Sequence, residues 1–279
     1  MKQNLKYYLK DKLSKKELEL VPSSFDMVGD IMIFSEFPKE LVKKEKLIGN
    51  IILQNYHHVK TILKKTKKYS GKFRTPKLKV IAGEKRKETV CRENSVLIKL
   101  DVEKVYFSAR MSSERKRIAE QIKPNESILV MFSGCGVYPL VIAKNTNCKE
   151  VYGIEINPIA HKYALENITI NKLENKIKLF VGDVRKAMPK IKKKFDRILM
   201  PLPKSGEGFL DLSLKYIKKG GVIHFYDFLH EEEFFKAGEK IKKACQISRK
   251  KYKILRTVKC GQYSPRFYRV CVDFSVDSF

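Results

Sequence analysis

From Met111 onward, short apolar runs and amphipathic runs alternate without interruption. The strand-like runs span residues 126–132, 151–157, 177–183, 195–203 and 221–228. The helix-like runs span residues 112–122, 137–145, 158–171, 208–221 and 231–247. Strands that alternate with helices predict a doubly wound, mainly parallel sheet with helices on both faces. Two further strand-like runs, at 252–259 and 266–274, complete this α/β domain.

The first part of the chain has a different pattern. Residues 5–19 have helical spacing and many lysines, a short strand follows a turn within 23–35, and Pro38 opens a helix that runs to Ile52. Three stretches then alternate in the manner of strands, at 59–65, 74–83 and 95–107. We therefore predict a short basic helix (1–20), a small α+β domain (21–105) and the α/β domain (106–279).

The charge of the chain indicates its partners. Lys and Arg number 59 against 31 Asp and Glu, a net charge of +28. Between Lys60 and Lys87, twelve basic residues face one acid, Glu84, and Tyr69, Phe73 and Arg74 lie among them. Aromatic and guanidinium planes in a basic stretch suit RNA bases, although a solvated sheet face or a lysine-rich proteome would also give such a count. We predict a nucleic-acid partner.

Other classes of protein are disfavoured. No apolar stretch approaches the roughly 20 residues that span a membrane, and the charged N-terminus does not resemble a signal peptide. The six cysteines are scattered, with no spacing typical of a zinc site. We expect reduced thiols, a cytoplasmic location, no membrane and no metal.

The segment VMFSGCGVYP (130–139) ends a strand in two glycines, Gly134 and Gly136. In doubly wound sheets, ligands bind beyond the carboxyl ends of the strands, at such a turn. A dinucleotide fingerprint would need a third glycine where the chain has Pro139. Glu155 ends the next strand and can accept both ribose hydroxyls of a nucleoside, and Asp183 could face the adenine. The pattern fits S-adenosylmethionine at least as well as NAD, and a simple packing turn is the alternative.

Several motifs together carry a family resemblance. The segments YFSARMSSERKRIA (106–119), VMFSGCGVYP, EINPIAHKYALENITIN (155–171) and DRILMPLPKSGEGFL (196–210) resemble the archaeal and eukaryotic tRNA (guanine-37-N1)-methyltransferases. SFDMVGDIMIF and GKFRTPKLKVIAGE resemble their N-terminal RNA-binding domain, so the resemblance covers residues 21–279. The sister family of wybutosine-pathway aminocarboxypropyltransferases shares much of this pattern. The extra N-terminal module of the methyltransferases, which grips the outer corner of tRNA, has no room here.

The resemblance implies a Rossmann-like class I methyltransferase with a smaller N-terminal α+β RNA-binding domain. It would be a monomer that acts with S-adenosyl-L-methionine on position 37 of the tRNA anticodon loop. It assigns Glu114 as the base for the guanine N1 proton, Arg74 as the partner of O6, and Arg110 as a further catalytic residue. The residues assigned to the cofactor are Arg115, Phe132, Gly134, Gly136, Glu155, Ile156, Asn157, Asp183, Val184 and Pro201.

Two of these assignments have local alternatives. Glu114 stands in the first turn of a helix, where an acid complements the helix dipole and could pair with Arg110. Arg74 could contact a phosphate instead of O6.

Pro201, which we also count among the catalytic residues, departs from the Asn-Leu-Pro of most family members, because the chain has Pro-Leu-Pro at 201–203. Proline offers only a carbonyl oxygen there. It resembles the archaeal branch that also methylates C7 of the tricyclic wyosine precursor, although drift without a second activity would look the same. The remaining alternatives are aminocarboxypropyl transfer, a non-catalytic RNA-binding protein and a nicotinamide dehydrogenase, against which Pro139 counts.

Overall fold

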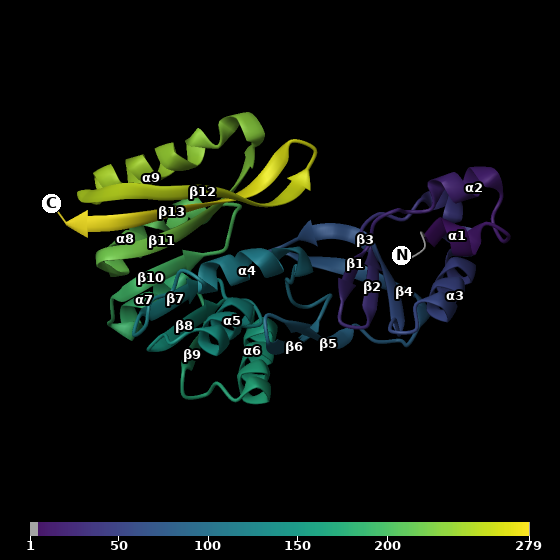
Figure 1. Ribbon diagram of the computed structural model, residues 1–279, viewed down its shortest axis with the longest axis horizontal. Coiled ribbons are helices and arrows are strands. Elements are labelled where there is room, and N and C mark those ends of the chain that lie inside the picture. The colour runs from purple at the N-terminus through teal and green to yellow at the C-terminus, as the bar shows by residue number, and fades with distance from the viewer. Residues whose placement is uncertain (1–4, 279) are drawn as a thin grey trace. The chain divides into compact units, whose positions relative to one another are not determined.

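The computed structural model describes residues 5–278, and for residues 68–70 and 278 it describes the backbone alone. The chain forms two compact units (Figure 1). The first comprises the residues up to 92 and residues 97–109, and the second comprises residues 93–96 and the chain from 110 onward. None of the described helices has both the length and the apolar character needed to cross a membrane.

The first unit is built on a four-stranded sheet in the order β1-β2-β3-β4. Its strands are β1 (Asp26–Val28), β2 (Ile31–Phe34), β3 (Thr61–Ser70) and β4 (Thr75–Gly83). β2 and β3 are parallel, so the chain crosses between them through η1 (Lys39–Lys44) and α3 (Glu45–Asn55). Gly49 lets α3 approach β4 closely, because a Cβ there would lie 2.4 Å from the Cβ of Ala82. This is a small α+β unit, as predicted.

The N-terminal residues belong to this unit rather than standing apart from it. α1 (Leu5–Leu9) and α2 (Lys15–Leu20) flank a turn, and Ser14 and Glu17 form a capping box at the start of α2. The side chains of Leu5, Leu9 and Leu13 are buried in one core with those of β2 and α3. The leucine spacing of four thus serves packing, and residues 5–20 do not form the separate basic helix that we expected.

The boundary between the units also differs from the expected 105/106. β5 (Glu88–Glu93), which we did not predict, and β6 (Val96–Asp101) form a two-stranded sheet, and only its turn groups with the second unit. The Nδ2 of Asn145 donates to the Asn94 carbonyl in that turn (2.8 Å). The main crossing between units lies at 109/110, where η2 (Ala109–Met111) leads into α4 (Ser112–Ala119).

The second unit contains a seven-stranded sheet in the order β12-β13-β11-β10-β7-β8-β9. The strands are β7 (Ser127–Met131), β8 (Glu150–Glu155), β9 (Ile177–Val181), β10 (Phe195–Met200), β11 (Ile217–His230), β12 (Lys250–Ser264) and β13 (Phe267–Ser278). β7 to β11 are parallel, and β13 is antiparallel to both β11 and β12. The expected doubly wound, mainly parallel sheet is confirmed.

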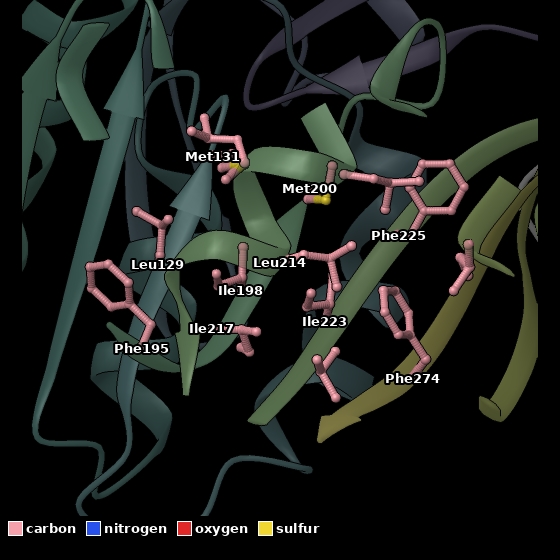
Figure 2. Close-up of a cluster of buried hydrophobic side chains, with 14 of the residues drawn as sticks. Leu129, Met131, Phe195, Ile198, Met200, Leu214, Ile217, Ile223, Phe225 and Phe274 are labelled. Atoms are coloured by element: carbon pink, nitrogen blue, oxygen red, sulfur yellow. The ribbon is translucent and has the colours of Figure 1, made fainter. Parts of the chain in front are cut away.

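Helices lie against both faces of this sheet (Figure 1). They are α5 (Val137–Asn145), α6 (Pro158–Asn171), α7 (Val184–Ile191), α8 (Leu210–Tyr216) and α9 (Phe235–Ile247), with the short turns η3 (Gly206–Phe209) and η4 (Glu231–Glu233). Figure 2 shows part of the core, in which Ile198, Ile223 and Phe274 from three strands meet Leu214 of α8. Burial of this apolar surface is the main stabilising contribution in the unit.

The helix predicted over 208–221 ends at Tyr216, and Ile217 already pairs with Phe195 at the start of β11. Gly220 has a φ of 72°, and a Cβ at Gly221 would lie 2.9 Å from the Asp196 carbonyl oxygen. The two glycines therefore allow an irregular entry into the strand that the helical pattern concealed.

Candidate active site

The strand order reverses between β7 and β10, and the chain turns that follow these strands meet at the carboxyl edge of the sheet. The glycine loop follows β7, Glu155 ends β8, Asp183 follows β9 and Pro201 follows β10. Ligands of open α/β sheets bind at such a switch point. The structure therefore brings these four predicted positions to one edge.

The glycine loop leaves β7 through three left-handed residues. The φ angles are 58° at Phe132, 58° at Gly134 and 83° at Gly136, which caps α5. Gly136 also packs closely, because a Cβ there would lie 3.2 Å from the Cβ of Ala164. Positive φ is uncommon for a bulky residue such as Phe132, whose ring lies 4.9 Å from that of Phe209. Strained backbone of this kind concentrates at ligand sites.

Glu155 ties β8 to this loop. One carboxylate oxygen accepts from the backbone N–H of Gly134 (2.7 Å) and the other from that of Asn157 (2.8 Å). Burial raises the pKa of Glu155, although the bonds from Asn157 and Gly134 act in the opposite direction. A buried carboxylate at a strand end, beside backbone N–H groups, is suited to accept the hydroxyls of a ribose.

The other predicted cofactor residues play mainly local parts. Asn157 caps α6 by accepting from the N–H of Ile159 (3.0 Å), and Asp183 caps α7 by accepting from that of Arg185 (2.8 Å). Ile156 is half-buried, and Val184 is buried in the core on the α7 side. Their backbone positions border the edge described above.

Pro201 is half-buried and lies in a tight turn. The N–H of Leu202 donates to the carbonyl of Met200 across it (2.7 Å), which makes a three-residue turn. The fixed φ of proline suits this turn, and the ring leaves no polar side chain at the end of β10.

Glu114 lies in the first turn of α4 and is 3% exposed. It does not stand as a lone helix-start acid. Arg117 donates to it through Nε (2.7 Å) and Nη2 (2.8 Å), and the hydroxyl of Tyr226 donates to Oε1 (2.6 Å). The hydroxyl of Tyr138 lies 3.0 Å from that of Tyr226, so it must be the donor in that pair.

The same arginine links Glu114 to a longer chain of charges. Arg117 also binds Asp273 on β13 (2.6 and 3.3 Å), and Asp273 accepts from Nδ1 of His224 (2.6 Å). Nε2 of His224 then accepts from Arg197 (2.8 Å), which pairs with Glu126. Burial lowers the pKa of His224, against the opposing effect of Asp273, so His224 stays neutral with its proton on Nδ1.

His224, Cys271 and Asp273 are of the types that bind metals, and their ligand atoms lie within 4.8 Å of one another. However, Asp273 is already bound by Arg117, and His224 faces the guanidinium of Arg197. The buried guanidinium of Arg197 and the half-buried one of Arg117 supply the positive charge that a metal would bring. We interpret this cluster as part of the ion-pair network.

Arg115 is buried and makes a two-point ion pair with Glu93 (2.5 and 2.6 Å). Its guanidinium lies 5.8 Å from the centre of the Tyr138 ring. Adjacent residues of α4 therefore make separate contacts: Glu114 binds Tyr226 on β11, and Arg115 binds Glu93 beside the β5–β6 turn.

Arg110 and Arg74 are the remaining predicted catalytic residues. Arg110 is exposed in η2. Arg74 belongs to the first unit, at the β3–β4 turn, where it has a φ of 50° and burial lowers its pKa. Phe73 beside it is 41% exposed, whereas the side chain of Tyr69 lies outside the described residues.

The sequence patterns missed Tyr226, Arg117, Asp273 and His224. The i,i+3 spacing of Glu114 and Arg117 on a helix was a usable signal. The other contacts join residues up to 156 positions apart, and nothing in the local sequence indicates them.

Comparison with known proteins places this geometry in a family. A family model described as the TRM5/TYW2 methyltransferase domain matches residues 89–255. Another, described as the TYW2 N-terminal domain, matches residues 5–86, and so includes the helices that we expected outside the shared region.

Three curated relatives show the range of the family. Trm5b of Pyrococcus abyssi, a tRNA (guanine(37)-N(1))-methyltransferase, is 38% identical over 92% of this chain and 76% of its own. Taw22 of Nanoarchaeum equitans, a tRNA (guanine(37)-N(1))/4-demethylwyosine(37)-methyltransferase, is 35% identical over 90% and 98%. The tRNA(Phe) (4-demethylwyosine(37)-C(7)) aminocarboxypropyltransferase of Methanocaldococcus jannaschii is 34% identical over 89% and 96%.

Solved structures agree. The crystal structure of Pyrococcus abyssi Trm5b has a TM-score of 0.85 and 38% identity, with 96% of this chain and 79% of that chain covered. The complex of aTrm5 with tRNALeu has a TM-score of 0.85 and 30% identity, covering 99% and 78%. Methanocaldococcus jannaschii TYW2 in complex with AdoMet has a TM-score of 0.71 and 27% identity, covering 92% and 100%. The chain belongs to the TRM5/TYW2 methyltransferase family.

Proposed function

We propose that this protein transfers a methyl group from S-adenosylmethionine to N1 of guanine-37 in tRNA. The observation that carries the proposal is the glycine loop and Glu155 at the switch point, in a chain 38% identical to a tRNA (guanine(37)-N(1))-methyltransferase. The net charge of +28 supports a polyanionic substrate.

The residues at the edge fit S-adenosylmethionine. Glu155 offers a buried carboxylate for ribose hydroxyls, and the left-handed Gly134 and Gly136 keep the loop backbone open to a ligand. Phe132 and Asp183 border the same edge. When bound, this cofactor supplies an electrophilic methyl group.

The protein must then position guanine and manage its N1 proton, since N1 is a poor nucleophile until that proton leaves. We assign Glu114 as the acceptor of the proton. Hydrogen bonds from Arg117 and from the hydroxyl of Tyr226 fix the position of this carboxylate. Oε2 accepts one bond from Arg117, and a carboxylate oxygen can accept two. The parts of Arg74 at O6 and of Arg110 rest on the family resemblance.

The test is incubation with a tRNA transcript bearing G37 and methyl-labelled cofactor, followed by nucleoside analysis. Glu114→Gln should keep cofactor affinity and lower the single-turnover rate by about 10²–10⁴. Asp273→Asn is the matched control, because it disturbs the same Arg117 without removing the base. An equal loss in both variants would make Glu114 a structural residue, and unlabelled G37 with the wild type would refute the proposal.

A second candidate is aminocarboxypropyl transfer on the same scaffold. The match of residues 5–86 to the TYW2 N-terminal domain favours it, as does the coverage of 96% of an aminocarboxypropyltransferase. The two reactions attack different carbons of the cofactor. Label in the methyl group and label in the carboxyl group therefore separate them when the product tRNA is counted.

We also propose that the enzyme methylates C7 of the tricyclic precursor, because its relative Taw22 is a tRNA (guanine(37)-N(1))/4-demethylwyosine(37)-methyltransferase. Pro201 carries no polar side chain committed to one target, whereas an asparagine would be left unpaired with the wrong one, at about 1–3 kcal/mol. Pro201→Asn should retain N1 methylation and depress C7 methylation about tenfold. Absence of any C7 product from the wild type would leave Pro201 without this role.

We expect the basic stretch from Lys60 to Lys87 to contact tRNA phosphates. Each contact on a single-stranded region adds about 0.7 to the salt slope. Replacing four of its lysines should reduce the slope of log K for tRNA binding against log salt by roughly two to three units. An unchanged slope would mean that the phosphate contacts lie outside this stretch. A monomeric state and a cytoplasmic location stay predictions.

A further inference from the structure

Part of the second unit extends past the edge that holds the cofactor loops. Met200, the last residue of β10, is paired with Phe225, yet β11 continues for five residues to His230. β13 accompanies it, since His230 pairs with Phe267, and β12 runs alongside to Ser264. At about 3.3 Å per residue, this overhang is roughly 16 Å long. Figure 1 shows its turn in yellow, where β12 meets β13.

One face of the overhang is aromatic. Side chains alternate along a strand, so Phe228 and His230 share the face of Tyr226. Their paired neighbours on β13, Arg269 and Phe267, lie on the same face. The Phe228 ring is 4.5 Å from that of Tyr263 on β12, and the Arg269 guanidinium lies 5.2 Å from the Phe228 ring centre.

This aromatic face is open at its outer side. Tyr263 is 70% exposed and Phe267 is 42% exposed. Single exposed aromatic residues are common, but here the exposed Tyr263 ring adjoins the Phe228 ring, which a cation covers. Phe267 also lies 5.3 Å from the ring of His230. Flat exposed rings with a guanidinium are what unstacked RNA bases bind.

The face continues toward Glu114. Tyr226, whose hydroxyl binds Glu114, is two residues before Phe228 on the same strand and face. A nucleotide on Tyr263 and Phe228 would therefore neighbour one whose base approaches Glu114. No side chain of the mechanism above lies on the overhang beyond Tyr226.

The charge of β12, the strand that carries Tyr263, suits a polyanion. β12 carries five basic residues and no acid over 250–264. Lys251, Lys253 and Arg256 pair with Asp277, Ser275 and Asp273, so they share the face that Arg117 meets, in the part of β12 that precedes the overhang. Arg266 at the turn is bound by Glu231 and Glu232, and its charge is therefore offset.

We propose that the aromatic face formed by Phe228, Tyr263, Phe267 and Arg269 binds, by stacking, the nucleotide adjacent to the methylated one in a single-stranded RNA loop. The choice of substrate rests on the proposed function, but the stacking surface does not depend on methyl transfer. Removing the exposed Tyr263 ring should weaken RNA binding without disturbing the core.

The experiment uses the full chain and an RNA stem-loop with the anticodon arm of a tRNA carrying G37. 2-Aminopurine replaces the nucleotide on either side of G37, because stacking quenches its fluorescence. Tyr263→Ala should remove the quenching on one side of G37 and weaken stem-loop binding about tenfold. Tyr263→Phe keeps the ring, so both the quenching and the affinity for the stem-loop should stay at the wild-type level. Phe235→Ala is the matched control, since Phe235 is 61% exposed on α9.

Each outcome decides something. Quenching of 2-aminopurine on neither side of G37 would overturn the stacking surface. Equal losses of RNA affinity in Tyr263→Ala and Phe235→Ala would overturn it as well. Either result is expected if this face binds a protein partner instead. Quenching that Tyr263→Ala removes, with no methylated guanine from the wild type, would support the surface and refute the proposed function. Full methylation of guanine-37 with no quenching would support the proposed function and refute the stacking surface.

Discussion

The two halves of the large sheet are built differently. Around β7 and β8, the edge is shaped by left-handed backbone and by Glu155, whose bonds reach Gly134 and Asn157, 21 and 2 positions away. Around β10, β11 and β13, buried charged side chains hold the structure, and Arg117 and Asp273 are 156 positions apart. One half is held by backbone hydrogen bonds around the loop that we propose for the cofactor, and the other uses ion pairs to fix α4 against the sheet.

The difference separates binding from stability. A carboxylate that accepts from backbone N–H groups can exchange partners when a ligand arrives, at small cost. Two buried carboxylates that share one arginine cannot lose it without leaving buried charge unpaired. Changes in the first half should therefore alter cofactor affinity, and changes in the second should alter the free energy of unfolding.

The largest effect is expected for Arg117→Met. Glu114 and Asp273, both fully or almost fully buried, would lose their shared cation. The free energy of unfolding should fall by about 3–5 kcal/mol, measured by urea denaturation. Lys116→Met on the same helix is the control, because Lys116 is 67% exposed and should change stability by less than about 0.5 kcal/mol.

Equal unfolding midpoints for Arg117→Met and the wild type would show that the ion pairs do not support the fold. The claim that ion pairs stabilise the half around β10, β11 and β13 would then be wrong.

The same division explains what the sequence could predict. The alternation of strands and helices and the Gly134–Glu155 spacing are local patterns, so the fold and the proximity of these two residues were accessible. Tyr226 and Asp273 reach Glu114 and Arg117 only through the register of β11 and β13, which no local pattern specifies. Leu5 and Leu9 were counted as part of a basic helix because lysines surround them, although their burial follows from tertiary packing.

Glu155→Gln should act on the other half. The amide nitrogen would face the N–H of Gly134 or of Asn157 and could not accept from it. Loss of the charged acceptor for ribose hydroxyls should weaken S-adenosylmethionine binding about 10–100-fold, measured by calorimetry. The free energy of unfolding should fall by about 1–3 kcal/mol, because one buried N–H loses its acceptor, which is less than the loss in Arg117→Met. Glu150→Gln, at the opposite end of β8, should leave the affinity unchanged. A loss of stability without a loss of affinity would reverse the comparison.

The network should also respond to pH through His224. Its pKa is lowered by burial from 6.5, so the unfolded chain binds more protons as the pH falls. The contribution of the neutral His224 ring to the free energy of unfolding is fully present above about pH 6.5. It is lost on acidification, by up to about 1.4 kcal/mol per pH unit. Asp273 does not contribute in this window, because its pKa is also lowered, from 3.8, by its bonds to His224 and Arg117, which outweigh burial.

His224→Gln removes the titration while keeping an acceptor and a donor. Its unfolding free energy should depend less on pH between about 6.5 and 5 than that of the wild type, and His161, whose pKa burial also lowers, is present in both and cancels. Parallel pH profiles for the two proteins would place the acid sensitivity elsewhere.

The smallest effect concerns a side chain in the backbone-built half. Ser133 is 6% exposed, and its hydroxyl has no hydrogen-bond partner among the residues that the structure describes, although its N–H donates to the Ile154 carbonyl (2.9 Å). If the loop acts through its backbone alone, Ser133→Ala should leave the cofactor dissociation constant within about twofold and raise the unfolding free energy by up to about 1 kcal/mol, since a buried unpaired hydroxyl is removed. Ser213→Ala is the control of opposite sign, because its buried hydroxyl donates to the Leu210 carbonyl (2.8 Å) and should cost about 1 kcal/mol. A tenfold loss of cofactor affinity in Ser133→Ala would mean that this hydroxyl finds its partner on the ligand, and the glycine loop would then bind by side chain as well as by backbone.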